Sequence, residues 1–365
     1  DALNHFLALG SLRALHLYNY DTFDHRASVG FRWEQLTELT LAPIARGEGY
    51  TLTLLTALDI LSRAKSLRSC TMNLTAGEDA IVHNRTQPAI TLPFLHTLDL
   101  YLAINLGGVP YANQDDAVQI FNRLITPSLK TLTISSWITA VPPPFSTHIP
   151  FLCLLSQPAV KIETLNISCH SNPRSYIDCL QLTPHLRSLS MNGWIGNIQD
   201  ATQIENLEST CYEELFQSLN PPDGSIPPLC PKLEEIQFIY CHSLPDPMTL
   251  LDFFKTRMPG NNESKFSFPT LHSSGSMTIN DDIAPNVSTL KVFGVKYTER
   301  HGQVTAELID RASRLREQGL DLYIRLPRPQ RRRRILEKLF QGSTWADSSE
   351  LGKPGVEHYQ SEHYW

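Results

Sequence analysis

Two stretches of the chain, LHTLDL at Leu95–Leu100 and LKTLTI at Leu129–Ile134, share the spacing Leu-x-x-Leu-x-Leu. Successive hydrophobic triplets of this kind begin 24, 31, 28, 34, 33, 24 and 47 residues apart, which is typical of stacked structural repeats. The pattern therefore predicts a repeat protein built to present a surface. The triplets are Leu12/Leu15/Leu17, Leu36/Leu39/Leu41, Leu67/Cys70/Met72, Leu95/Leu98/Leu100, Leu129/Leu132/Ile134, Ile162/Leu165/Ile167, Leu186/Leu189/Met191 and Leu233/Ile236/Phe238.

Each triplet predicts a short strand, because Leu-x-Leu sends two side chains to the same face of a strand. Between the triplets, helical patterns cover residues 52–64, 115–125, 175–182 and 211–219. The alternation predicts an α/β leucine-rich-repeat solenoid, with a curved parallel sheet on its concave face and helices on its convex face. Prolines just ahead of several triplets would end each helix and start the extended segment.

The predicted solenoid spans residues 1–326, with irregular insertions near 195–228 and 259–285 and a short strand at 265–268. It closes with a strand at 290–295, a helix at 304–318 and a strand at 320–324. Residues 327–365 are first basic and then polar, which predicts a disordered tail. The first repeat is already running at residues 4–9, so we expect a capping segment upstream of it.

The composition is typical of a soluble chain, and the net charge does not indicate the kind of partner. Of the 365 residues, 19% are charged and 41% hydrophobic, and the net charge of −6 gives no general attraction to nucleic acid or membrane. The seven cysteines form no CxxC pair, which favours reduced thiols and a location in the cytoplasm, the nucleus or both. Five Asn-x-Ser/Thr sequons favour a secreted protein instead, although Asn73 and Asn166 fall on or beside predicted strands.

In a leucine-rich strand the residues between and after the buried positions face the concave side. These positions predict a ladder of hydroxyls and amides with carboxylates towards its flanks, suited to a peptide or a basic protein surface. Thr and Ser are also tolerated on any solvent-facing strand, so this second interpretation stays open. The candidate partner-binding residues are Glu38, Thr40, Thr71, Thr97, Asp99, Tyr101, Thr131, Thr133, Thr164, Asn166, Ser188, Ser190, Glu235 and Gln237.

Two further features are candidates for recognition. Tyr20, Trp137, Trp194 and Tyr240 follow strand ends, where they would form an aromatic rim of interface anchors or would simply pack the loops. The run Arg331, Arg332, Arg333 and Arg334 matches a nuclear-import signal, and a solvated basic face is the alternative. No nucleic-acid-binding motif accompanies this run, so nucleic acid is not the partner we expect.

The sequence contains none of the common catalytic or cofactor signatures: GxxxxGK[ST], GxGxxG, GxSxG and HExxH are all absent. His and Cys neighbours such as Cys169-His170 and Cys241-His242 lack a partner at metal-ligand spacing. We therefore expect no enzyme activity, no cofactor and no metal site, and no apolar run is long enough to expect a membrane partner.

The later repeats read LCPKLEEIQF at Leu229–Phe238, LLDFFKTRM at Leu250–Met258, VSTLKVFGVK at Val287–Lys296 and EQGL at Glu317–Leu320. With these motifs the chain resembles the leucine-rich-repeat portion of mushroom-type fungal F-box proteins. The likeness spans most of residues 1–326, and its more specific motifs lie between 229 and 326. It implies the substrate-recognition arm of a ubiquitin ligase, in which the repeats hold the protein to be modified.

One part of that family pattern is missing, because residues 1–365 contain no F-box helix of the Leu-Pro-x-Glu-Leu-Leu kind. A Skp-type adaptor and a cullin are therefore expected partners only if an F-box lies upstream in the full-length protein. The expected function is non-catalytic protein binding, with the target on the concave face. The alternative is a stand-alone leucine-rich-repeat scaffold or receptor-like protein unrelated to ubiquitin.

Overall fold

A computed structural model describes the parts of the chain that carry the repeats. Contacts divide the chain into Asp1–Pro327 and Arg328–Trp365, and every described residue lies in the first unit. The predicted tail, the strand at 265–268 and the helix end at 4–9 lie outside the described residues. Those residues are 11–18, 32–42, 52–75, 88–104, 120–138, 149, 151–168, 173–192, 214–220, 228–239, 247–257, 288–296 and 306–325.

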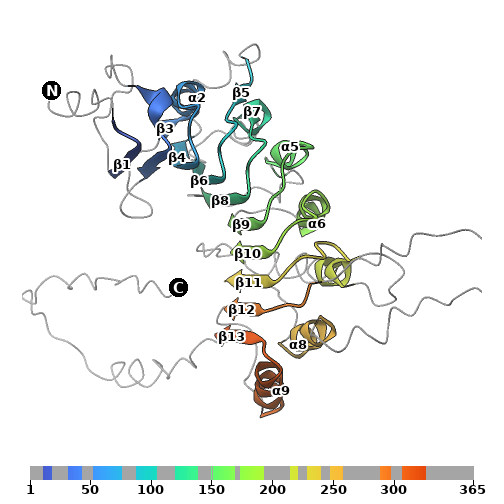
Figure 1. Ribbon diagram of the computed structural model, residues 1–365. Coiled ribbons are helices and arrows are strands. Elements are labelled where there is room, and N and C mark those ends of the chain that lie inside the picture. Colours follow the sequence, from blue (N-terminus) through green and yellow to red (C-terminus); the bar gives the residue numbers. More distant parts are fainter. Residues whose placement is uncertain are drawn as a thin grey trace, which may run out of the picture. The chain divides into compact units, whose positions relative to one another are not determined.

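The main element is one parallel sheet in which each repeat strand pairs with the next along the chain (Figure 1). All eight predicted triplets form strands of this sheet, and the two predicted closing strands complete it. A short strand, β3 (Leu52–Thr53), pairs with the end of β4. The main strands are β1 (Ala14–Tyr18), β2 (Glu38–Ala42), β4 (Ser69–Thr75), β6 (Thr97–Ile104), β8 (Thr131–Ile138), β9 (Thr164–Ser168), β10 (Ser188–Asn192), β11 (Glu235–Ile239), β12 (Val292–Lys296) and β13 (Asp321–Arg325).

The triplets supply the core because the strands stack without a shift. Leu98 pairs with Leu132, which pairs with Leu165, and all three side chains have 0% exposure. Each such leucine contributes about 1.5–3 kcal/mol on burial. Side chains on the opposite face of the same strands stay partly exposed. In β9, β10 and β11, buried and half-buried side chains alternate along the strand. The sheet therefore has one apolar and one open face.

Helices lie along one side of the row of strands (Figure 1) and pack on the apolar face through residues such as Leu58 and Ile60. The helix after β3 begins where Thr53 caps it, since the Thr53 hydroxyl accepts a hydrogen bond from Thr56 N at 3.3 Å. The helical segments are η1 (Trp33–Gln35), α2 (Leu54–Arg63), 120–123, α5 (Leu152–Leu155), α6 (Pro173–Gln181), 214–219, α8 (Pro247–Thr256) and α9 (Ala306–Glu317). The architecture is α/β and compatible with a solenoid.

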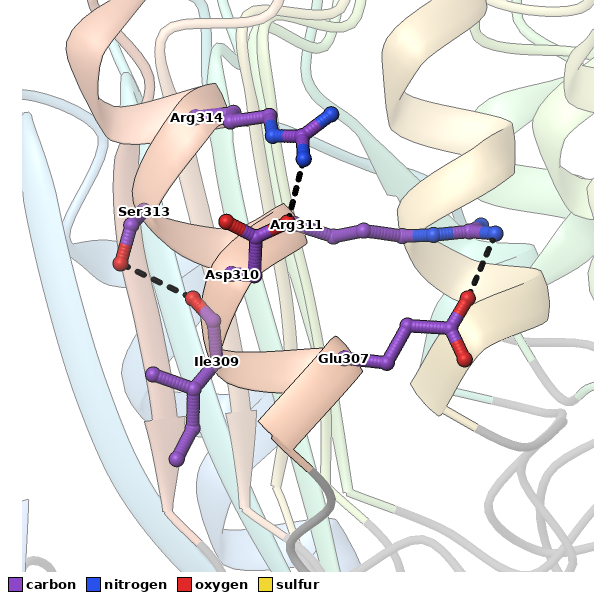
Figure 2. A network of polar contacts seen from close by, with 6 residues as sticks. All are labelled: Glu307, Ile309, Asp310, Arg311, Ser313 and Arg314. Atoms are coloured by element: carbon purple, nitrogen blue, oxygen red, sulfur yellow. Dashed lines mark hydrogen bonds and ion pairs between the residues drawn. The ribbon is translucent and has the colours of Figure 1, made fainter.

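The last helix, α9, carries ion pairs and a hydrogen bond along its own surface. Figure 2 shows two ion pairs at four-residue spacing, Arg311 to Glu307 at 3.1 Å and Arg314 to Asp310 at 2.5 Å. Ser313 also donates to the Ile309 carbonyl at 2.9 Å. Each such pair contributes only about 0.2–0.5 kcal/mol. Leu315 of α9 is buried, so the helix also packs on the rest of the array.

The helix predicted at 115–125 is wrong at its end. Residues 120–123 are helical, but Leu124–Ile125 forms strand β7, which pairs with β5 (Ile90–Thr91) in a second, two-stranded sheet. The helical periodicity misled because Leu124 is fully buried, as a helix residue at that position would also be. Of the described helices, none has the length and hydropathy to cross a membrane.

Truncating a triplet leucine should be costly, and truncating its neighbour on the open face should not. We expect Leu132→Ala or Leu165→Ala to lower the free energy of unfolding by about 2–5 kcal/mol, because each leaves a cavity in a fully packed stack. Urea denaturation followed by circular dichroism measures the change. Ser135→Ala in the same strand as Leu132 is the matched control, with an expected change within about 0.5 kcal/mol. Equal effects at Leu132 and Ser135 would contradict the assignment of the two faces.

Candidate binding surface

The open face of the sheet, here called the polar face, consists of the third, fifth and seventh residues counted from the first leucine of each triplet. The backbone register places all fourteen sequence-predicted residues on it. Neighbouring strands lie about 4.8 Å apart, so residues at equal positions form continuous rows. The third-position row is Glu38, Ser69, Thr97, Thr131, Thr164, Ser188, Glu235; the fifth-position row is Thr40, Thr71, Asp99, Thr133, Asn166, Ser190, Gln237; and Tyr101 lies between Asn73 and Ser135 in the seventh-position row.

The middle of the polar face has short, uncharged side chains only. On β8, β9 and β10 every position of the three rows is Ser, Thr or Asn, and all are partly exposed. Asn166 Nδ2 donates a hydrogen bond to Thr133 Oγ1 at 3.1 Å, which links adjacent strands. Hydroxyls and amides both donate and accept, so this region offers closely spaced hydrogen-bonding groups without a preference for charge.

At the first strand the polar face carries an ionisable cluster. His16 Nδ1 lies 2.9 Å from Thr40 Oγ1, and His16 Nε2 lies 3.9 Å from a carboxylate oxygen of Glu38. Tyr18, two residues further along β1 and on the same face, is 55% exposed. His16 and Tyr18 follow from the same positional rule as the fourteen predicted residues. The sequence rule already predicts them on this face, and the register of β1 with β2 agrees.

At the other end, Gly294 on β12 shapes the surface. A Cβ at Gly294 would lie 3.4 Å from Gln237 Cγ, so Gln237 packs directly beside this glycine. Gly294 pairs directly with Gln237 in the parallel register. The sequence signal for this position was a lone glycine at the fifth place of a triplet, where every earlier repeat carries a side chain.

A row of charged residues borders the polar face and was missed by sequence reasoning. It lies at the second position of the triplets, directly before each strand. Glu234 accepts from Lys291 at 2.8 Å and lies 3.8 Å from Arg187. Lys130 and Glu163 form a further pair at 3.2 Å. These exposed pairs contribute at most about 1 kcal/mol each, and the signal that could have revealed them is alternating charge at this position.

The structure does not describe the side chains of the remaining predicted recognition residues. Tyr20, Trp194 and Tyr240 lie outside the described residues, as do Arg331–Arg334. Trp137 belongs to β8, where its backbone pairs with Ala103, but its side chain is outside the described set. The aromatic rim and the import signal thus remain predictions.

The described cysteines are packed rather than reactive. Burial, with a smaller contribution from Asp99, raises the pKa of Cys70 to about 12. Burial also raises the pKa of Cys230 to about 12, against smaller opposing effects of Thr183 and Arg257, and it raises the pKa of Cys153. These thiols stay protonated near neutral pH, which makes them poor nucleophiles. In the described part of the chain, no group of three His, Cys, Asp or Glu residues could hold a metal ion.

Fold and surface together define a parallel α/β repeat array with one long hydrogen-bonding face. Comparison with protein-family models, curated proteins and solved structures finds no match for this chain. The class of the molecule is therefore carried by its own geometry.

The buried thiols give a direct check of the repeat packing. We expect Cys70 and Cys230 to resist iodoacetamide at pH 8 in the native protein and to react readily in guanidinium chloride, because burial suppresses both access and thiolate formation. Half-buried Cys153 should react at an intermediate rate. Isotope-coded alkylation with peptide mass spectrometry resolves the sites individually. Native labelling of Cys70 as fast as in denaturant would contradict the described packing of β4.

Proposed function

We propose that this chain is a leucine-rich-repeat protein-binding module that holds a target polypeptide on its polar face, as the substrate-recognition arm of an F-box-type ubiquitin ligase. The observation that carries the proposal is the in-register polar face itself. Three rows of partly exposed side chains cross successive strands from β4 to β10, and Asn73 is the one buried position among them.

The dimensions of this face suit a protein better than a small molecule. Nine steps of about 4.8 Å between the ten main strands give a surface about 43 Å long. A specific protein interface buries about 800 Å² on each partner, which such a face can supply. Small ligands are instead enclosed in pockets that cover most of their surface. A long open sheet face contacts its partner at many points, and this favours an extended or folded polypeptide.

The charge distribution further restricts the target. The uncharged centre accepts polar backbone and side-chain groups, whereas Glu38, Asp99 and Glu235 place carboxylates towards the flanks. Glu38 has 56% of its side-chain surface exposed and is therefore accessible to a cation on the target. Rim charges act mainly on the association rate and on the choice of partner. We therefore propose a target with a polar contact strip and basic residues at its ends.

The link to a ubiquitin ligase rests on the resemblance of residues 229–326 to F-box proteins. Within its Cys-Pro motif, Cys230 adopts a left-handed backbone with φ of 50° and is buried. Its thiol lies 3.5 Å from the Thr183 carbonyl, and Arg257 Nη2 donates to the Cys230 carbonyl at 3.3 Å. The motif thus shapes the turn before β11, so it supports a repeat type rather than a contact with a target.

Charge reversal on the polar face should weaken target capture. We expect the double variant Glu38→Lys/Glu235→Lys to recover target proteins at least tenfold less efficiently in affinity purification of the full-length protein, with its thermal midpoint unchanged. Asp99→Asn is the third variant, chosen because Asp99 is half-buried and a lysine would not fit the site. Quantitative mass spectrometry of the captured proteins is the readout.

Glu34→Lys is the matched control, since Glu34 is equally exposed but belongs to η1 rather than to the sheet. Unchanged capture by the double variant would place the target away from the polar face. Absence of a Skp-type adaptor and a cullin among the captured proteins would remove the ligase assignment. The protein-binding role would then stand on the target alone.

A further inference from the structure

A second surface lies on the helix side of the sheet, away from the polar face. A groove of about 1060 Å³ runs between α2 and the segment 88–94, which contains β5. Leu55 and Leu58 of α2 line one side, and Ile90 and Phe94 line the other. Figure 1 shows α2 and the small β5–β7 sheet on the same side of the main strands. The groove therefore exists because this part of the array carries extra strands.

Three cations line this groove, and two of them have no carboxylate partner among the described residues. Arg63 pairs with Asp59 at 2.6 Å within α2. Lys65 and Arg123 form no ion pair with any described residue. The groove thus carries an excess of positive charge, although the whole chain has a net charge of −6. This local excess attracts an anionic group.

Arg123 is the more unusual of the two. Its Nη2 donates only a long hydrogen bond of 3.4 Å to the Pro88 carbonyl, and its Nε and Nη1 are shielded from solvent without any hydrogen-bond partner. Burial lowers the pKa of Arg123, as expected for a guanidinium that has lost part of its hydration. A guanidinium binds a carboxylate with two parallel hydrogen bonds, so a carboxylate in the groove is a suitable partner for the Arg123 cation.

The groove also presents apolar surface next to these cations. Phe94, which lines the groove, is 55% exposed. Single exposed hydrophobic residues are common, but large aromatics beside cations are typical anchors of interfaces. The combination favours a ligand with both carboxylates and apolar side chains. A nucleic acid or a free phosphate would leave the exposed ring of Phe94 without a matching contact.

We propose that this groove docks an acidic segment of a partner protein, with carboxylates at Lys65 and Arg123 and an aromatic or aliphatic side chain against Phe94. The segment binds independently of the target on the polar face, because the groove lies on the opposite side of the sheet. The inference does not rest on the ligase assignment. It gives the repeat array a second binding site for another protein.

The test uses a fluorescein-labelled peptide, Glu-Glu-Phe-Glu-Glu-Leu-Glu-Glu, and its counterpart with every Glu replaced by Gln. We expect fluorescence anisotropy at low salt to show saturable binding of the acidic peptide to the full chain, weakened at least tenfold by Lys65→Gln and by Arg123→Gln. Phe94→Ser should weaken binding as well. Raising the salt concentration should release the bound peptide. Arg314→Gln on α9 removes an equal charge elsewhere and should leave the affinity unchanged.

Lys65 is exposed, so Lys65→Gln decides the outcome even if Arg123→Gln unfolds the protein, which its thermal midpoint would reveal. Lack of binding to the acidic peptide would overturn the proposal. Equal binding of the Gln peptide, or binding that Lys65→Gln leaves intact, would overturn it too. Failure of these measurements would not affect target capture on the polar face, which the Glu38→Lys/Glu235→Lys variant tests separately.

Discussion

One forked hydrogen bond in each repeat holds this array in register. The carbonyl of the residue before a strand accepts from two consecutive N–H groups of the next repeat: Arg68 O accepts from His96 N at 2.8 Å and from Thr97 N at 3.0 Å. The same fork recurs eight times in the described residues, from Arg13 to Glu234. A slip of one residue would turn every leucine to solvent and every threonine inward. The core and the polar face therefore depend on the same constraint.

This constraint explains why repeats of very different length coexist. Only the triplet and its fork need to match between neighbours, and a longer connection costs little additional loop-closure entropy. The spacer between β6 and β8 therefore accommodates β7, and the spacer before β6 accommodates β5. The groove lined by Lys65 and Arg123 is a consequence of this tolerance, since it forms where connections of two successive repeats pair with each other.

The sequence was sufficient for features that repeat and insufficient for features that occur once. The triplet predicts the strands, their order and the side of each residue, because a period of two leaves no alternative. The strands Ile90–Thr91 and Leu124–Ile125 contain two residues each and lie 34 positions apart in the sequence. Strands this short leave no periodic pattern in the sequence. The contact of Lys291 with Glu234 spans 57 positions and depends on the stacking itself. Such contacts can be located only after the register is known.

The opposite charges of the two candidate surfaces follow from the same geometry. Every strand sends alternate side chains to opposite faces, and the connections leave on the helix side, so substitutions on one side do not disturb the other. Carboxylates lie towards the flanks of the polar face, and Lys65 and Arg123, without an ion pair to any described residue, border the groove beside α2. The net charge of the chain sums over the polar face and the groove and therefore reveals neither surface. The register therefore places the two proposed binding sites on opposite sides of the sheet, just as it separates core from surface.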